Sequence, residues 1–363
     1  MDTAIKHEHK PPGATYRRVV VTRHGGPDVL QVMEEPLPEP GSGEVRVRVL
    51  AAGISAYDLM LRRSGKLIGA PRVPYTPGED VVGVVDKLGA GVSALALGQR
   101  VLGGTFSVGG GGYAECICMP AEQWVPVPEG VDPAQAACLP ANYLTAYYVM
   151  HQAARVQRGE RVLVHGAAGG VGSALLDLGR LAGLERYGTA SKYNHERVSA
   201  LGATPIDYRT EDFCARIRQL TGDGVDVVFD PIGGGRQLRR SYRALRPGGR
   251  LAWFGVAATA RKGIWVIPSS LLTIALLSLL RDGKQVPLTP DLGEHSQAHN
   301  DWYRETLAKL LAWLAEGQIN PLVAERFPLL EAARAHEFLE RGGHAGKVVL
   351  LASAHPANNT FVG

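Results

Sequence analysis

The sequence predicts an α/β protein in which a β-barrel domain precedes a domain built on a doubly wound parallel sheet. Residues 44–50 alternate strictly between apolar and polar side chains, as a half-buried strand does. From residue 185 onward strands alternate with helices, which is typical of a parallel sheet covered on both faces. Residues 166–172 form a glycine-rich turn between an apolar strand and an apolar helix.

The first third of the chain is rich in short strands and poor in predicted helix. Prolines and glycines over 36–43 mark a loop before the strand at 44–50, and glycines 109–112 indicate a hairpin or a mobile loop. We expect strands at 16–22, 44–50, 81–85 and 100–102.

Near residue 134 the pattern changes from short predicted strands to helices that alternate with strands. Residues 141–154 have helical spacing and precede the strand that ends at the glycine turn. We expect later strands at 185–190, 204–207, 225–230 and 249–254, and helices at 194–201, 211–220 and 301–316. Residues 287–300 are polar and predict a surface excursion, whereas 347–351 predict a closing strand that returns to the first domain.

Length and composition exclude several classes of protein. The 363 residues suffice for two domains, and 45% hydrophobic with 20% charged residues is ordinary globular composition. The net charge of +4 is spread without a basic stripe, so we expect no nucleic-acid partner. Four cysteines make no disulfide framework, and Cys116 and Cys118 have no second pair at metal spacing. We therefore expect free thiols.

Neither the first residues nor the most apolar segment predicts a membrane protein. Residues 1–10 lack the apolar core of a signal peptide, so we expect a disordered tail and a cytoplasmic protein. Residues 263–280 are nearly uncharged, but the run is shorter than the about 20 residues of a span and Pro268 interrupts it. We interpret it as a helix at a subunit interface or over a substrate pocket.

The glycine turn predicts a dinucleotide site. Gly166, Gly169 and Gly172 follow a Val-Leu-Val strand and precede a helix, which is the context that the motif requires. Backbone N–H groups of the turn and the helix N-terminus then face a pyrophosphate, with Gly170 and Val171 in the same turn.

The next predicted strand favours NADPH over NADH. An NAD site usually has an acidic residue at the end of this strand, but residues 189–195 contain none. Ser191 and Lys192, with Arg197 and Arg209 nearby, suit a 2′-phosphate through charge-assisted hydrogen bonds. The alternative is that these are solvated loop residues. Tyr208 is a candidate contact for the adenosine or a surface aromatic.

The chain from about 16 to 351 resembles the medium-chain dehydrogenase/reductase family, in its quinone oxidoreductase and zeta-crystallin branch. The resemblance rests on the glycine turn and on four further motifs, at residues 51–58, 76–83, 227–230 and 247–250. It implies a GroES-like barrel over 16–140, completed by 301–352, and a Rossmann domain over 141–300, with loose tails at 1–15 and 353–363. It also implies a site in the cleft between the domains, and a homodimer.

One departure from this family concerns the metal. Zinc alcohol dehydrogenases hold their catalytic ion with Cys, His and Cys, and the matching positions here are Ser55, Glu79 and Ala141. Those enzymes also carry a four-cysteine lobe where residues 95–115 contain no cysteine. We therefore predict no metal.

Without a metal, the predicted reaction is hydride transfer from NADPH to an acceptor that spreads charge by its own conjugation, a quinone or an α,β-unsaturated carbonyl. The candidate catalytic residues are Ser55, Tyr57, Asp58 and Tyr143, with Tyr75 and Asn142 as further candidates. The resemblance places Thr145 near the nicotinamide and backbone groups of Phe254 and Val256 near its carboxamide.

Two other functions stay open at this stage. The long segment 259–300 suits a biosynthetic enoyl or carbonyl reductase with a bulky substrate. The zeta-crystallin resemblance also leaves open a module that binds NADPH with little turnover.

Overall fold

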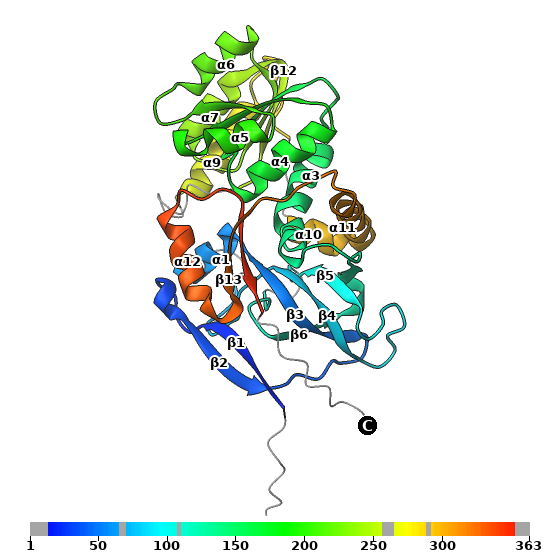
Figure 1. Cartoon of the computed structure of the whole chain (residues 1–363). Coiled ribbons are helices and arrows are strands. Elements are labelled where there is room, and N and C mark those ends of the chain that lie inside the picture. Colours follow the sequence, from blue (N-terminus) through cyan, green and yellow to red (C-terminus); the bar gives the residue numbers. More distant parts are fainter. Residues whose placement is uncertain (1–13, 65–69, 107–109, 256–264, 288–291, 353–363) are drawn as a thin grey trace, which may run out of the picture.

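A computed structural model describes residues 14–64, 70–106, 110–255, 265–287 and 292–352, and it confirms the predicted barrel and doubly wound sheet (Figure 1). The first and last parts of the chain form the lower domain in this view. The middle part forms the upper domain, and the segments that join them run past α3 (Thr145–Tyr148) and α11 (Asn300–Ala315).

The barrel is a seven-stranded sheet with a separate hairpin. Along the sheet the strands are β13 (Val323–Pro328), β14 (Lys347–Leu351), β3 (Glu44–Ile54), β4 (Asp80–Leu88), β5 (Arg100–Gly104) and β7 (Trp124–Pro126), and β6 (Cys116–Pro120) also pairs with β3. The hairpin is β1 (Thr15–Val21) with β2 (Leu30–Pro36). The closing strand at 347–351 lies where the sequence predicts it, antiparallel to β3.

β3 differs from the half-buried strand that its alternation predicts. Arg46 is buried on it because its guanidinium donates to Asp86 at 2.8 Å and to the Pro38 carbonyl at 3.0 Å. Two helices that the sequence did not predict pack beside the barrel, α1 (Ala56–Ser64) and α12 (Ala332–Arg341), and Arg62 of α1 forms an ion pair with Glu340 of α12.

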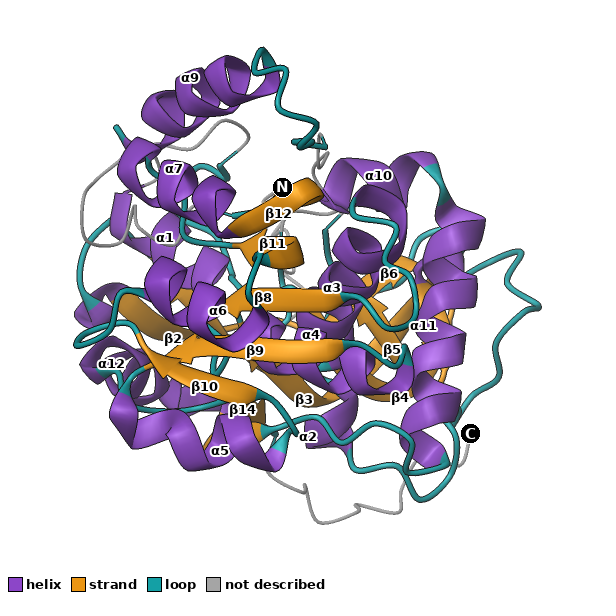
Figure 2. Ribbon diagram, turned by 90° about the horizontal axis from the view of Figure 1, so that it is seen from above, coloured by secondary structure: helices purple, strands orange, loops and turns teal. Residues whose placement is uncertain are grey.

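The second domain is a five-stranded parallel sheet (Figure 2). Its order is β10 (Thr204–Asp207), β9 (Glu185–Ala190), β8 (Arg161–His165), β11 (Val225–Asp230) and β12 (Leu245–Trp253). The bounds of β9, β10 and β11 match the prediction, β8 lies directly before the glycine turn as expected, and β12 begins four residues earlier and ends one residue earlier than expected. The order reverses at β8, so the carboxyl ends of β8 and β11 border the crevice in which such sheets bind ligands.

Helices cover both faces of this sheet. α4 (Gly170–Leu181) and α5 (His195–Ala200) share one core with it, and α6 (Phe213–Thr221), α7 (Gly235–Ala244) and α9 (Val266–Ser278) share the other. α7 was not predicted from the sequence. In the described ranges no helix combines the length and the apolar character needed to cross a membrane.

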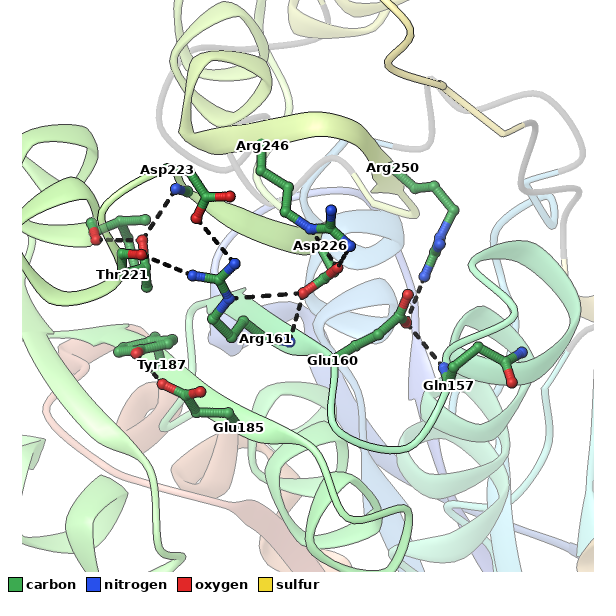
Figure 3. Close-up of polar contacts among 12 residues, drawn as sticks. Gln157, Glu160, Arg161, Glu185, Tyr187, Thr221, Asp223, Asp226, Arg246 and Arg250 are labelled. Atoms are coloured by element: carbon green, nitrogen blue, oxygen red, sulfur yellow. Dashed lines mark hydrogen bonds and ion pairs between the residues drawn. The ribbon is translucent and has the colours of Figure 1, made fainter.

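A polar network closes the amino ends of β8, β11 and β12 (Figure 3). Asp226 accepts hydrogen bonds from the backbone N–H of Arg161 at 2.8 Å and from Nε of Arg246 at 2.6 Å, and Glu160 pairs with Arg250 at 2.6 Å. Because this network lies at the edge opposite the glycine turn, it stabilises the sheet rather than forming the crevice.

Two helices, α10 (Leu292–Ala298) and α11, follow the second domain in the chain. α10 is a helix where the sequence predicts a surface excursion, and α11 begins one residue before its prediction. Tyr303 of α11 accepts a hydrogen bond from the Gly104 N–H at 2.7 Å, which attaches this helix to the end of β5.

Candidate functional site

The glycine turn has the geometry of a dinucleotide cradle. Gly166 follows β8 with a φ of 64°, a left-handed conformation that suits glycine. A side chain on Gly172 would meet the Gly166 carbonyl carbon at 2.8 Å, so the helix approaches the turn this closely only because residue 172 is a glycine. The N-cap residue Gly169 has no side chain to bond the first N–H groups of α4, at Gly170, Val171 and Gly172. These groups are therefore free to bind a phosphate.

The carboxyl ends of β9 and β10 lie on the same edge and carry positive charge. Lys192 is exposed just after β9, next to the half-buried Ser191. After β10, Tyr208 is 48% exposed and the Arg209 guanidinium lies 5.8 Å from the centre of its ring. The nearest acid in sequence, Asp207, is buried and accepts from the Arg209 N–H at 3.0 Å, so it does not face a ligand as a free carboxylate.

Of the three remaining predicted cofactor residues, the structure describes Phe254 and Thr145. Phe254 follows β12, and its N–H donates to the Asp230 carbonyl at 3.2 Å. Thr145 begins α3, and its hydroxyl donates to the Ala141 carbonyl at 2.6 Å. Val256 lies outside the described residues.

The barrel meets the glycine turn directly. The Gly346 N–H, just before β14, donates to the Ala168 carbonyl at 2.9 Å. Asn142 packs against α4 so closely that a side chain on Gly170 would lie 2.5 Å from its Nδ2. The carboxyl edge of the sheet, at the glycine turn, is thus in contact with the segment that leads into β14 of the barrel.

A second cluster lies in the barrel, where β3 ends and β4 begins. Asp58 accepts the backbone N–H of Ser55 at 2.7 Å, the Ser55 hydroxyl at 2.9 Å and the Gly78 N–H at 2.9 Å. The Ser55 hydroxyl also lies 3.3 Å from Oε2 of Glu79. Two of the four predicted catalytic residues, Ser55 and Asp58, are therefore in direct contact.

The other two candidate catalytic residues lie elsewhere. Tyr57 is adjacent in sequence to Asp58 and 36% exposed. Tyr143 is buried, and its hydroxyl donates to Asp177 of α4 at 2.9 Å, the same carboxylate oxygen that accepts the Asn320 N–H at 2.8 Å. The phenol proton of Tyr143 is therefore engaged in packing α4 and not directed at the Ser55–Asp58 pair.

Three carboxyl groups and one lysine share this part of the barrel. Asp80 and Lys347 form an ion pair that is almost completely buried, and Asp80 also accepts the Ala141 N–H at 2.6 Å. Burial raises the pKa of Glu79 well above its usual range, and the negative charges of Asp58 and Asp80 raise it further against the opposing effect of Lys347. Burial also raises the pKa of Asp58 and of Asp80.

Sequence reasoning missed part of this site. Glu79 was considered only as a position that matches a zinc ligand, and Lys347 is too far along the chain for any spacing to connect it with Asp80. A buried network beneath the crevice was also missed. In it His165 contacts the hydroxyls of Thr189 and Ser241, each at 3.0 Å. It joins the ends of β8 and β9 to α7.

The residues at the zinc positions do not fit a zinc ion. Zinc sites use thiolate, imidazole or carboxylate ligands. Here one position is a serine hydroxyl bonded to Asp58, one is the carboxyl of Glu79, and Ala141 offers no side-chain donor. No group of three or more His, Cys, Asp and Glu side chains suited to a metal occurs in the described part of the chain.

Comparisons with known proteins agree with this architecture. A model of the alcohol dehydrogenase GroES-like domain matches residues 41–129, and a model described as zinc-binding dehydrogenase matches residues 201–350. Rat quinone oxidoreductase is 32% identical over 343 residues, covering 92% of this chain and 97% of that protein. The human synaptic vesicle membrane protein VAT-1 homolog is 32% identical over 355 residues, covering 94% and 88%.

Solved structures give the same result. The structure of Escherichia coli quinone oxidoreductase complexed with NADPH has a TM-score of 0.81 at 28% identity, covering 92% of this chain and 99% of that one. The two model matches, the full-length relatives and the shared fold lead to one conclusion. The chain belongs to the medium-chain dehydrogenase/reductase family of oxidoreductases and is similar to its quinone oxidoreductases.

Proposed function

We propose that this protein is an NADPH-dependent oxidoreductase that reduces a quinone or an α,β-unsaturated carbonyl without a metal ion. The observation that carries the proposal is the pairing of an open glycine turn with a barrel cluster whose zinc positions are Ser55, Glu79 and Ala141.

The chain's own residues fit NADPH. The N–H groups at the start of α4 suit the pyrophosphate, and Ser191 and Lys192 suit the 2′-phosphate. Thr145 and Phe254 are the proposed neighbours of the nicotinamide, which supplies the hydride when bound. The E. coli relative whose structure contains NADPH supports this choice of cofactor.

The proposed class of substrate follows from the side chains at the positions that hold zinc in related enzymes. With an alcohol or a simple ketone, the charge that develops on the oxygen stays localised there, and a bound metal ion is one way to stabilise it. A quinone or enone delocalises that charge, so hydrogen bonds from groups such as Ser55 suffice. We also propose, from the sequence and the family resemblance, a homodimer located in the cytoplasm.

The test is NADPH consumption with 9,10-phenanthrenequinone and with a simple enone, measured beside the zinc content of the purified protein. We expect turnover that chelators do not affect. Stoichiometric zinc together with loss of activity on chelation refutes the metal-free reaction.

Two other functions are distinguished by the same assay. A reductase of a bulky biosynthetic substrate would turn over only large or carrier-bound acceptors. A module with little turnover would bind NADPH tightly and consume none across a broad acceptor panel. The similarity to proteins named for a synaptic vesicle membrane is the observation that favours testing this last case.

A further inference from the structure

The Ser55 hydroxyl is shared by two carboxyl groups. It lies 2.9 Å from Oδ2 of Asp58 and 3.3 Å from Oε2 of Glu79, and it accepts the Asp58 N–H at 3.1 Å. A serine hydroxyl has one proton to donate and two lone pairs to accept with. It can therefore satisfy only one of the two carboxyl groups as a donor.

The surroundings of the two carboxyl groups indicate which one accepts that proton. Asp58 also accepts two backbone N–H groups, from Ser55 and Gly78, which stabilise its ionised form. Glu79 has no such backbone donors among the described residues. With Asp58 as the carboxylate, the hydrogen-bonding capacity of the Ser55 hydroxyl is fully used if Glu79 is protonated and donates to its second lone pair.

The charges around Glu79 agree with this assignment. Asp58 and Asp80 are the acidic neighbours, and Lys347, the cation nearest them, is already paired with Asp80. The Tyr113 hydroxyl lies near the same cluster and contacts His336 at 3.2 Å. Burial lowers the pKa of His336 to about 3, so this histidine supplies no cation. Ionising Glu79 would leave two uncompensated negative charges in a buried cluster.

An independent feature indicates that a polar ligand belongs at this cluster. Tyr75 lies near enough to Asp58 for that charge to act on its hydroxyl, the residue is only 8% exposed, and within the described part of the chain this hydroxyl has no hydrogen-bond partner. Buried polar groups are nearly always bonded, so the unpaired hydroxyl suits a ligand with a polar oxygen.

The cluster is also joined to the proposed cofactor site. Asp80, next to Glu79, holds the Ala141 N–H, and the Ala141 carbonyl holds the hydroxyl of Thr145. The half-buried Glu79 therefore lies one residue from a chain of contacts that reaches Thr145, a proposed neighbour of the nicotinamide.

We propose that Glu79 is the proton donor of the reduction, giving its carboxyl proton to the oxygen of the acceptor as that oxygen gains negative charge. This inference rests on the proposed function, which supplies NADPH as the source of the hydride and its two electrons. The O–H bond of Glu79 breaks, an O–H bond forms on the enolate or hydroquinone oxygen, and the electron pair stays on Glu79. The resulting carboxylate lies beside Asp58 and Asp80, so it recovers a proton from water.

The first test compares Glu79→Gln with Glu305→Gln, a control on the exposed face of α11. The amide keeps the size of the side chain but has no acidic proton. We expect Glu79→Gln to lower kcat with an enone about 100-fold, within the range of general acid catalysis, with NADPH affinity unchanged. Glu79→Asp should recover part of the loss, and Glu305→Gln should behave as wild type. A Glu79→Gln variant that keeps wild-type kcat overturns the donor role.

The second test needs no turnover. Infrared difference spectra of the protein without NADPH should show the carbonyl stretch of a protonated carboxyl at neutral pH, present in Glu305→Gln and lost in Glu79→Gln. A spectrum without that band overturns the proposal. Wild-type kcat should also fall at alkaline pH as Glu79 ionises, and Glu79→Gln should lack this fall.

The proposal and the function it rests on fail in different ways. Wild-type protein that oxidises no NADPH with any acceptor refutes the proposed function, and the donor role with it. Wild-type protein that turns over while Glu79→Gln retains kcat and its alkaline decline refutes the donor role alone.

Discussion

Substituting Gly172 by alanine tests the cofactor assignment most directly. The added methyl would lie 2.8 Å from the Gly166 carbonyl carbon and 2.9 Å from Cα of Ala167, and nearer still to the Gly166 oxygen. Optimal carbon–carbon separations are about 3.5–4.0 Å, so the turn and α4 must move apart by about 1 Å. Both contacts are backbone, and no side-chain rotation relieves them.

This displacement has a predictable effect on binding. A misplacement of about 1 Å in a positioning group can cost about 100-fold. We expect the NADPH dissociation constant to rise by about that factor, which corresponds to about 2.8 kcal/mol. Fluorescence titration with NADPH measures it, and circular dichroism with thermal melting shows whether the protein remains folded.

Gly169→Ala is the matched control in the same turn. Its methyl would lie 3.2 Å from the Gly166 oxygen, and Gly169 has a φ of −76° that alanine adopts readily. We expect a much smaller loss of affinity. If folded Gly172→Ala protein binds NADPH as wild type does, the pyrophosphate does not lie at this turn.

Three further predictions concern charged groups. Lys192→Glu should raise KM for NADPH far more than KM for NADH, and equal changes would show that Lys192 does not contact the 2′-phosphate. Lys347→Met leaves Asp80 as an unpaired buried charge and should lower the free energy of urea unfolding by about 3–5 kcal/mol. Adding Asp80→Asn should recover much of this loss, and unchanged stability of the single variant would contradict the pairing. Glu79 holds its proton more tightly in the folded state than in the unfolded chain, where its pKa is near 4.5, so stability falls as pH rises above that value toward the raised pKa. Melting temperatures of wild type should therefore drop relative to those of Glu79→Gln over this range, and parallel curves would count against the raised pKa.

The predictable part of the fold is the part whose pattern is local. β9, β10 and β11 were predicted at their observed bounds because apolar runs and flanking turn residues mark both ends. α7 was not predicted because arginines dominate its sequence. Its buried residues, among them Leu238, Tyr242 and Ala244, show the helical face only once the sheet is in place.

The candidate site also has a part that the sequence predicts and a part that it does not. The glycine turn is contiguous in sequence, so its geometry could be anticipated. The barrel cluster is assembled from residues that only the fold brings together, and no spacing rule connects Glu79 with Lys347. Tyr143 illustrates the converse: it is a candidate proton donor in the sequence, but the direction of its hydroxyl depends on Asp177 of another element.

The hydrogen bond from Gly346 to Ala168 bears on any attempt to dissect this protein. The segment that contacts the glycine turn through this hydrogen bond comes from near the end of the chain, not from the domain that contains the turn. A Rossmann fragment expressed alone would lack that support. A chain cut before Gly346 would lose it too, along with the partner of β3 and the counter-ion of Asp80. We therefore expect the nucleotide-binding domain to bind NADPH only in a chain that also carries the segment from Gly346 onward.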